Sequence, residues 1–257
     1  TYKFSGEKYS LDTSADNITP NYTVDLNYVL TFKDEDLLVR ANCALDIKDA
    51  PLRELLIRYA GDMTVNRVEG RSAMADDYET FEKDGAKWLK IPFAPDTIGK
   101  TDLFINFEKS MKNTQSTPIP PIFIDGAKSV RGHILLAANR GLSLTVEDKD
   151  LKNLRRYPVG SAPLREPGLQ HNFRFKDQDW EGKVTVVHEQ VNIVSEVFHI
   201  GSVGEGTIYG SSIFTYHVSG APVDKIQLKI NPSVKNLEFT GGNIVDWKLL
   251  DGSTAEE

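Results

Sequence analysis

Apolar and polar residues alternate along most of this 257-residue chain, which is the pattern of β-strands with one buried face. The clearest alternating runs cover residues 22–32, 52–59, 88–93, 103–107, 183–187, 213–218 and 226–230. Gly, Asp, Asn and Pro residues, which favour turns, separate these runs. The pattern predicts an all-β chain of tandem antiparallel β-sandwich-like blocks rather than alternating strands and helices.

Three shorter segments carry other local signals. Residues 134–138 and 142–146 flank Asn139-Arg140-Gly141, which predicts a hairpin whose turn uses Gly141 at positive φ. Ser72 to Glu82 and Asp148 to Arg156 are the two helical candidates, and Asp148 stands where an N-cap would.

The hydrophobic pattern also repeats at an offset of about 171 residues. Ala50-Pro51 aligns with Ala221-Pro222, and Gly70 aligns with Gly241. Apolar positions between these anchors face apolar positions without a gap. At the same offset Tyr2-Lys3-Phe4 matches Phe173-Arg174-Phe175. Self-similarity at a fixed spacing indicates copies of one structural unit.

The repeat divides the chain into three predicted blocks. Residues 1–110 form a β-sandwich-like first copy, 111–172 a middle β block, and 173–257 a second copy that ends before the counterparts of the first copy's closing strands. Ser116 to Pro121, with three prolines, is the predicted stiff linker after the first block. We therefore expect a piece of a longer, repeat-containing, exported bacterial protein.

The composition argues against several classes of binding partner. The net charge is −7 and no block of Lys or Arg interrupts it, which argues against nucleic acid and against a polybasic membrane anchor. No apolar run approaches the roughly 18 residues of a transmembrane helix. Cys43 is the single cysteine, so an internal disulfide is impossible, and we predict that it is a small buried residue. An extracytoplasmic location, whether periplasmic, cell-surface or secreted, is the expectation.

One acidic segment offers a candidate site. Asp177, Asp179 and Glu181 occupy positions 1, 3 and 5 of a calcium-loop pattern, with Gly182 at position 6. Position 12 is His188 instead of the expected acid, so an acidic turn between two strands is the alternative interpretation. Trp180 in the same segment is a candidate sugar-stacking ligand, although an ordinary packed tryptophan is the favoured interpretation.

No set of catalytic residues stands out. His188-Glu189-Gln190-Val191-Asn192 lacks the second histidine of a zinc-peptidase helix, and Gly201 to Gly206 precedes a strand-like segment rather than a phosphate-binding helix. A nucleophile elbow is also missing. The sequence therefore predicts that the chain is not an enzyme and has no cofactor, calcium apart.

Residues 55–108 contain the string Leu-x-Ile, Val-x-x-Val-x-Gly, Trp-Leu-x-Ile-x-Phe and Leu-x-Ile-x-Phe-Glu. This string resembles the β-rich N-terminal domain of M1-type aminopeptidases. The resemblance implies a similar sheet architecture and no activity, because the paired-histidine zinc helix is not in this sequence. The chain also resembles tandem β-sandwich repeat modules of large uncharacterised bacterial envelope proteins.

Three function hypotheses follow. The first is a non-catalytic structural or protein-interaction module, whose partners are proteins or other domains of its parent. The second is a carbohydrate- or calcium-binding module centred on Asp177, Asp179, Glu181 and Trp180. The third is an accessory β-domain of a peptidase or other enzyme whose catalytic part lies elsewhere.

Overall fold

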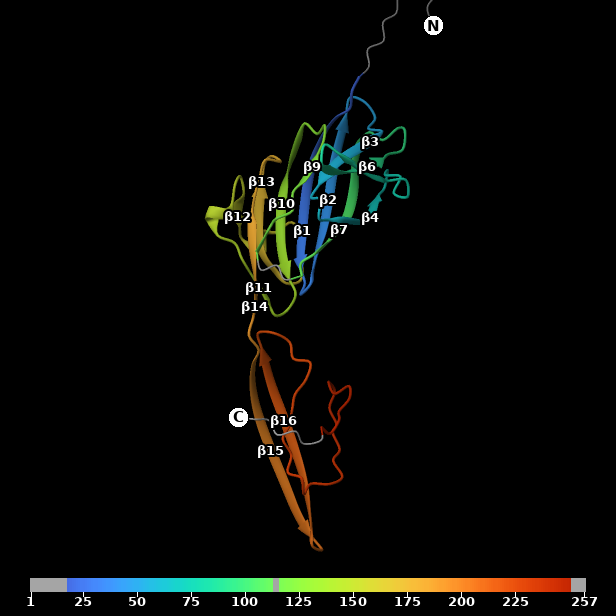
Figure 1. Ribbon diagram of the computed structural model, residues 1–257. Helices are drawn as coiled ribbons and strands as arrows, with labels where there is room; N and C mark the ends of the chain where they lie inside the picture. The colour runs from blue at the N-terminus through green and yellow to red at the C-terminus, as the bar shows by residue number, and fades with distance from the viewer. Residues whose placement is uncertain (1–17, 113–115, 251–257) are drawn as a thin grey trace, which may run out of the picture. The chain divides into compact units, whose positions relative to one another are not determined.

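The computed structural model describes residues 18–112 and 116–250, and it confirms the all-β class (Figure 1). Within those residues there is no α-helix, only the two short 3-10 turns η1 (Asp148–Asp150) and η2 (Val159–Ser161). The strands form four sheets of seven, four, three and two strands.

The largest sheet has seven strands. In spatial order they are β12 (Arg155–Tyr157), β13 (Leu169–Phe175), β10 (Ser129–Ala138), β1 (Asn21–Phe32), β2 (Asp36–Lys48), β7 (Gly99–Ser110) and β4 (Thr64–Gly70). Neighbouring strands are antiparallel except β1 and β10, which run parallel from Thr23 opposite Ser129 to Phe32 opposite Ala138. The centre of the sheet therefore joins segments that lie about a hundred residues apart in sequence.

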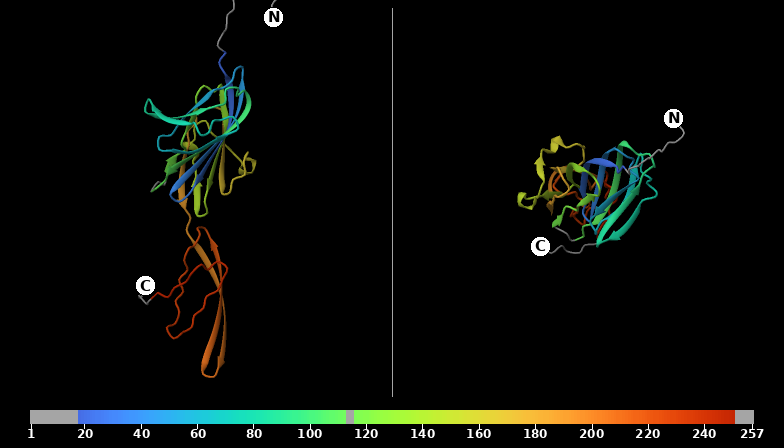
Figure 2. Two further views of the ribbon diagram at one scale, coloured as in Figure 1. Left: turned by 90° about the vertical axis from the view of Figure 1, so that its right-hand side faces the viewer. Right: turned by 90° about the horizontal axis from the view of Figure 1, so that it is seen from above.

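Two smaller sheets pack with the large one. The four-stranded sheet contains β5 (Glu79–Lys83), β6 (Ala86–Pro92), β3 (Glu54–Tyr59) and β9 (Ile122–Ile124). The three-stranded sheet contains β11 (Leu142–Thr145), β14 (Lys183–His188) and β8 (Ser116–Pro118). We call these three sheets together the sandwich body (Figure 2).

The alternating pattern explains the core of the sandwich body. On β1 and β2 every second side chain is buried, as a strand with one face on the core requires. These residues join those of the two smaller sheets in one hydrophobic cluster. Tyr59 of the four-stranded sheet, for example, contacts Phe107 of the large sheet with ring centroids 5.4 Å apart. The Tyr28 hydroxyl, buried between layers, donates to the Pro120 carbonyl at 2.8 Å.

The predicted hairpin at residues 134–146 is half correct. Gly141 has φ of 88°, as predicted for the turn. The flanking strands do not pair with each other, however, because β10 pairs with β1 and β13 whereas β11 pairs with β14. The turn instead carries the chain from the large sheet into the three-stranded one.

Both helical predictions are wrong. Residues 72–82 contain an isolated bridge from Ala73 to Phe93 and then strand β5, which pairs along β6. Residues 148–156 contain η1, a bridge from Lys152 to Glu181 and the start of β12. In each case pairing between extended segments satisfies backbone groups in place of a helix. The N-cap of η1 is Glu147 rather than Asp148, and the Asp148 carboxylate instead accepts a hydrogen bond from Arg156 at 2.7 Å.

The predicted block boundaries do not separate sheets. The large sheet contains strands from all three predicted blocks, and the predicted linker 116–121 includes β8 and the buried Ile119. By contacts the chain divides instead into two units, Thr1–Pro222 and Val223–Glu257. Residues 223–250 of the second unit contain no strand, so the strand predicted at 226–230 is wrong. The repeat itself stays a prediction, and its match at residues 2–4 lies outside the described residues.

The fourth sheet is a two-stranded ribbon, residues 192–219. It consists of β15 (Asn192–Gly204) and β16 (Thr207–Ser219), which pair without a register shift from Asn192 opposite Ser219 to Gly204 opposite Thr207. Glu205 and Gly206 both have positive φ, as the tight two-residue turn of a hairpin requires. We call this element the ribbon.

Candidate functional site

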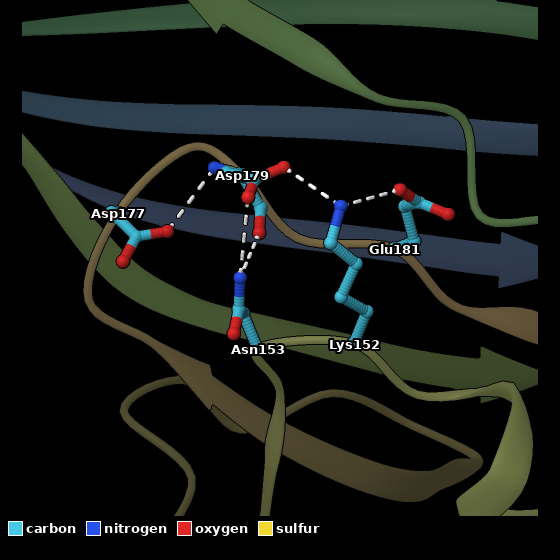
Figure 3. A network of polar contacts seen from close by, with 5 residues as sticks. All are labelled: Lys152, Asn153, Asp177, Asp179 and Glu181. Carbon is cyan, nitrogen blue, oxygen red and sulfur yellow. Dashed lines mark hydrogen bonds and ion pairs between the residues drawn. The ribbon is translucent and has the colours of Figure 1, made fainter.

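The predicted acidic segment is the turn between β13 and β14 (Figure 3). The Asp177 carboxylate accepts a hydrogen bond from the Asp179 backbone N–H at 3.1 Å. This contact closes an Asx-turn, a local turn that aspartate favours. Gln178, between them, points the other way. Its amide nitrogen donates to the Ile124 carbonyl at 3.0 Å, and its amide oxygen accepts from the Ile124 N–H at 2.6 Å. The turn is therefore fixed to β9.

Lys152 neutralises two of the three carboxylates. Its ammonium group donates to Asp179 at 3.0 Å and to Glu181 at 2.8 Å (Figure 3). The hydrogen bonds to Glu181 and then Asp179 raise the pKa of Lys152 above its ordinary value. Backbone hydrogen bonds between Lys152 and Glu181 hold the two segments together. The neighbouring Asn153 side chain donates to the Asp179 carbonyl at 2.5 Å.

This arrangement places a lysine where the sequence predicts calcium. Asp179 and Glu181 converge on one cation, the Lys152 ammonium, whereas Asp177 is turned to the backbone. In the part of the chain that the structure describes, no group of three or more His, Cys, Asp or Glu residues is arranged to hold a metal ion. Calcium binding at this turn stays a prediction, and an incoming ion would have to displace Lys152.

Trp180 does not serve as an exposed sugar platform. Its side chain is only 4% exposed and packs against Tyr28 and Phe175, with ring centroids 6.3 and 6.0 Å away. The indole therefore belongs to the core of the sandwich body. The alternative interpretation of Trp180 as a packed tryptophan is the correct one, because the turn exposes its carboxylates while directing the ring between Tyr28 and Phe175.

A pocket of about 540 Å³ opens on the far side of the same turn. Its wall includes Asp177, Gln178 and Asp179 from the turn, together with Arg58 of β3 and Phe123 of β9. The Arg58 guanidinium lies over the Phe123 ring, 5.1 Å from the centroid. Sequence reasoning missed this pocket because its residues come from segments up to 121 positions apart and share no motif.

Ionisable groups in the core are kept neutral. Burial raises the pKa of the Cys43 thiol to about 12, and the cysteine is free and buried as predicted. Burial, aided by nearby Asp125, also raises the pKa of Tyr22 to about 12.

Across the described residues no helix has the length and hydropathy needed to cross a bilayer.

Comparison with known proteins finds similarity only among solved structures. No family model matches the sequence, and no curated protein matches it. Yeast leukotriene A4 hydrolase is 11% identical, with a TM-score of 0.41 over 67% of this chain and 30% of the hydrolase. The M1 zinc metallopeptidase from Deinococcus radiodurans, solved as a mutant, is 7% identical, with a TM-score of 0.38 over 81% of this chain and 50% of the peptidase.

The chain thus spans half or less of the length of these solved neighbours. The matches fall in the N-terminal domain region of M1 peptidases. At this identity the similarity concerns the arrangement of strands.

Proposed function

We propose that the chain is a non-catalytic structural module that assembles with a second copy of itself through the free edge of β16. The observation that carries the proposal is the ribbon. Among the described residues, neither β15 nor β16 pairs with any strand outside the ribbon, so each has one row of backbone N–H and C=O groups without a strand partner. Such an edge is a template for another strand.

Both faces of the ribbon carry exposed apolar side chains among polar ones. Directly opposite residues share a face in an antiparallel pair. Phe198 and Ile213 therefore lie on one face, where they are 60% and 58% exposed. Val197 and Phe214 lie on the other, also exposed. A strand pair that is apolar on both sides is typical of a sheet covered on both sides, and an isolated two-stranded ribbon is at best marginally stable in water.

The charge pattern favours β16 as the edge and a second copy as the occupant. Thr207–Ser219 contains no Asp, Glu, Lys or Arg, whereas β15 contains Glu196. Two copies of β16 related by a twofold axis would meet antiparallel without placing like charges opposite each other. The same arrangement of β15 would add one Glu196 from each copy to the shared sheet, and β15 contains no Lys or Arg to pair with them.

The test is sedimentation velocity of the whole chain over about a hundredfold range of concentration, because dimer formation follows mass action. We expect a monomer–dimer equilibrium that Ile213→Lys weakens strongly, since each copy then places a lysine in the middle of the shared edge. Phe198→Lys is the matched variant, because Phe198 lies opposite Ile213 on the same face but on β15. Ile98→Lys controls for a new charge at an exposed isoleucine outside the ribbon.

Two results would overturn the proposal. A monomer at every concentration would remove the second copy as the occupant. Equal weakening by Ile213→Lys and Phe198→Lys would show that the copies meet through a face of the ribbon rather than through the β16 edge.

A further inference from the structure

The lining of the pocket beside the acidic turn includes three cations, for which the described part of the chain provides no acidic partner. Arg58, Lys128 and Lys176 line it, and in residues 18–112 and 116–250 none of the three forms an ion pair. Of the two acids in the wall, Asp179 is already neutralised by Lys152 from the other side. A chain with net charge −7 therefore presents a local excess of positive charge here.

The remaining lining combines apolar residues with hydrogen-bonding ones. Phe123, Ala127 and Val130 supply the apolar part, with Val130 only 3% exposed. Asp177 supplies carboxylate oxygens that can accept from hydroxyls, and Ser129 supplies a hydroxyl. Apolar surface combined with polar groups that fix the orientation of the ligand is typical of small-ligand sites.

Backbone hydrogen bonds fix the walls of the pocket in place. The side chain of Gln178 holds the acidic turn to β9 by two bonds with the Ile124 backbone. The Lys128 N–H donates to the Tyr22 carbonyl of β1 at 2.9 Å, just before β10 begins. The cations thus project from segments that the sandwich body already orders, which lowers the entropy lost on binding.

We propose that this pocket binds an acidic sugar residue of a glycan, with the sugar carboxylate paired with cations among Arg58, Lys128 and Lys176. The sugar ring would contact the apolar lining residues, and its hydroxyls would donate to Asp177. A neutral sugar would leave the cations without an anionic partner. A simple oxyanion would use neither the apolar lining nor the carboxylate of Asp177.

The test is calorimetric titration of the whole chain with a hexuronic acid oligosaccharide. We expect binding that is lost when the carboxyl groups of the same oligosaccharide are reduced to alcohols. Lys128→Gln combined with Lys176→Gln should weaken the affinity about tenfold, because two charge-assisted contacts are removed. Lys33→Gln combined with Lys83→Gln makes the same change of net charge at exposed lysines outside the pocket and should leave the affinity unchanged.

Asp177→Asn separates sugar recognition from attraction of charge alone. The substitution removes a negative charge beside the ligand, so pure electrostatic attraction predicts tighter binding. Recognition of hydroxyls predicts weaker binding, since the amide has one acceptor oxygen in place of two. The amide oxygen can still accept from the Asp179 N–H, which preserves the turn.

Three results would overturn the proposal: no binding of the uronic oligosaccharide, equal binding by both double lysine variants, or tighter binding by Asp177→Asn. Equal affinity for polyglutamate of the same charge would also overturn it, because only the field of the cations would then be recognised.

Discussion

The sandwich body and the ribbon treat their sheet edges in opposite ways. In the body the edge strands β12, β8 and β9 have three residues each, and β11 has four. The edge strand β4 has a register shift between Val65 and Arg67, and β5 carries charged residues at three of its five positions. Short, irregular or charged edges resist pairing with other chains. The ribbon has two edges of thirteen residues, no register shift and no Lys, Arg or Pro.

Burial differs in the same way. Strands β1 and β2 bury every second residue in the common core, whereas β15 has thirteen exposed residues in succession. The body therefore supplies its own hydrophobic stabilisation, which is the dominant favourable contribution to folding. The ribbon has little of its own and gains it only when another surface covers it. One continuous unit thus combines a part with its own hydrophobic core and a part whose apolar side chains remain exposed.

The largest expected effect concerns backbone packing in the body. A Cβ at Gly132 would lie 1.8 Å from the Leu26 carbonyl oxygen across the β1–β10 pair, a distance at which the strands must separate. We expect Gly132→Ala to lower the free energy of unfolding by about 4 kcal/mol or more, the range of severe steric conflicts. Urea denaturation followed by circular dichroism measures it.

Gly201→Ala in the ribbon is the matched control. A Cβ there meets no atom within 4 Å, so we expect a change of about 1 kcal/mol at most. Equal losses for the two alanine variants would contradict the division into packed and unpacked regions.

Deleting an isoleucine side chain tests the core directly. Ile105 on β7 is fully buried, whereas Ile200 on β15 is 55% exposed. We expect Ile105→Ala to cost about 2–5 kcal/mol of unfolding free energy, from lost burial and the cavity that remains. Ile200→Ala should change it by less than about 0.5 kcal/mol at a concentration where the chain is monomeric. Urea titrations also measure these two isoleucine variants. A loss for Ile200→Ala larger than about 0.5 kcal/mol would mean that the ribbon is packed.

The dependence of stability on alkaline pH tests the packing of the body, because burial in the body raises the pKa of the Cys43 thiol. Its folded pKa of about 12 lies above the ordinary value of 9.0, so the folded chain keeps a proton that the unfolded chain loses. The stability that the buried thiol contributes is complete below pH 9 and is lost as the pH rises toward 12.

Between pH 9 and pH 10 this linkage should remove about 1 kcal/mol of unfolding free energy from the wild type, and Cys43→Ala should remove less over the same interval. Urea titrations at both pH values give the two slopes. Tyr22 titrates in the same direction but from its ordinary value of 10.0, so it contributes less in this window. Identical pH dependence in the two proteins would mean that the thiol reaches solvent.

Much of the body was predictable because alternation reports directly on a strand with one buried face. The runs at 22–32 and 103–107 lie in β1 and β7 for that reason. Pairing partners were not predictable, since hydrogen bonds between strands leave no local trace in the sequence. The turn at Gly141 shows the difference: its positive φ follows from the glycine, whereas its link between two sheets depends on β14 and β1 elsewhere.

The candidate site shows the same limit. The sequence indicated an acidic turn between two strands, and the structure shows Asp179 and Glu181 of that turn on one cation. That the cation is Lys152 depends on a bridge between segments 27 and 29 residues apart. Trp180 was placed with its acidic neighbours along the chain, yet its ring joins the core because adjacent residues in an extended segment face opposite ways.

The smallest expected effect tests whether the Lys152 network matters beyond its own turn. Both its carboxylate partners are exposed, and exposed ion pairs contribute little to stability. We expect Lys152→Gln to lower the melting temperature by about 2 °C at low salt, less at high salt, with ribbon amide exchange unchanged. Lys149→Gln, which removes a pair with Glu147 alone, should do less. Because partners raise the pKa of Lys152, its contribution is complete below the ordinary lysine value of 10.5 and is lost as the pH rises through the folded pKa. A drop much larger than this, or altered exchange in β15 and β16, would mean that the acidic turn supports the ribbon as well as the body.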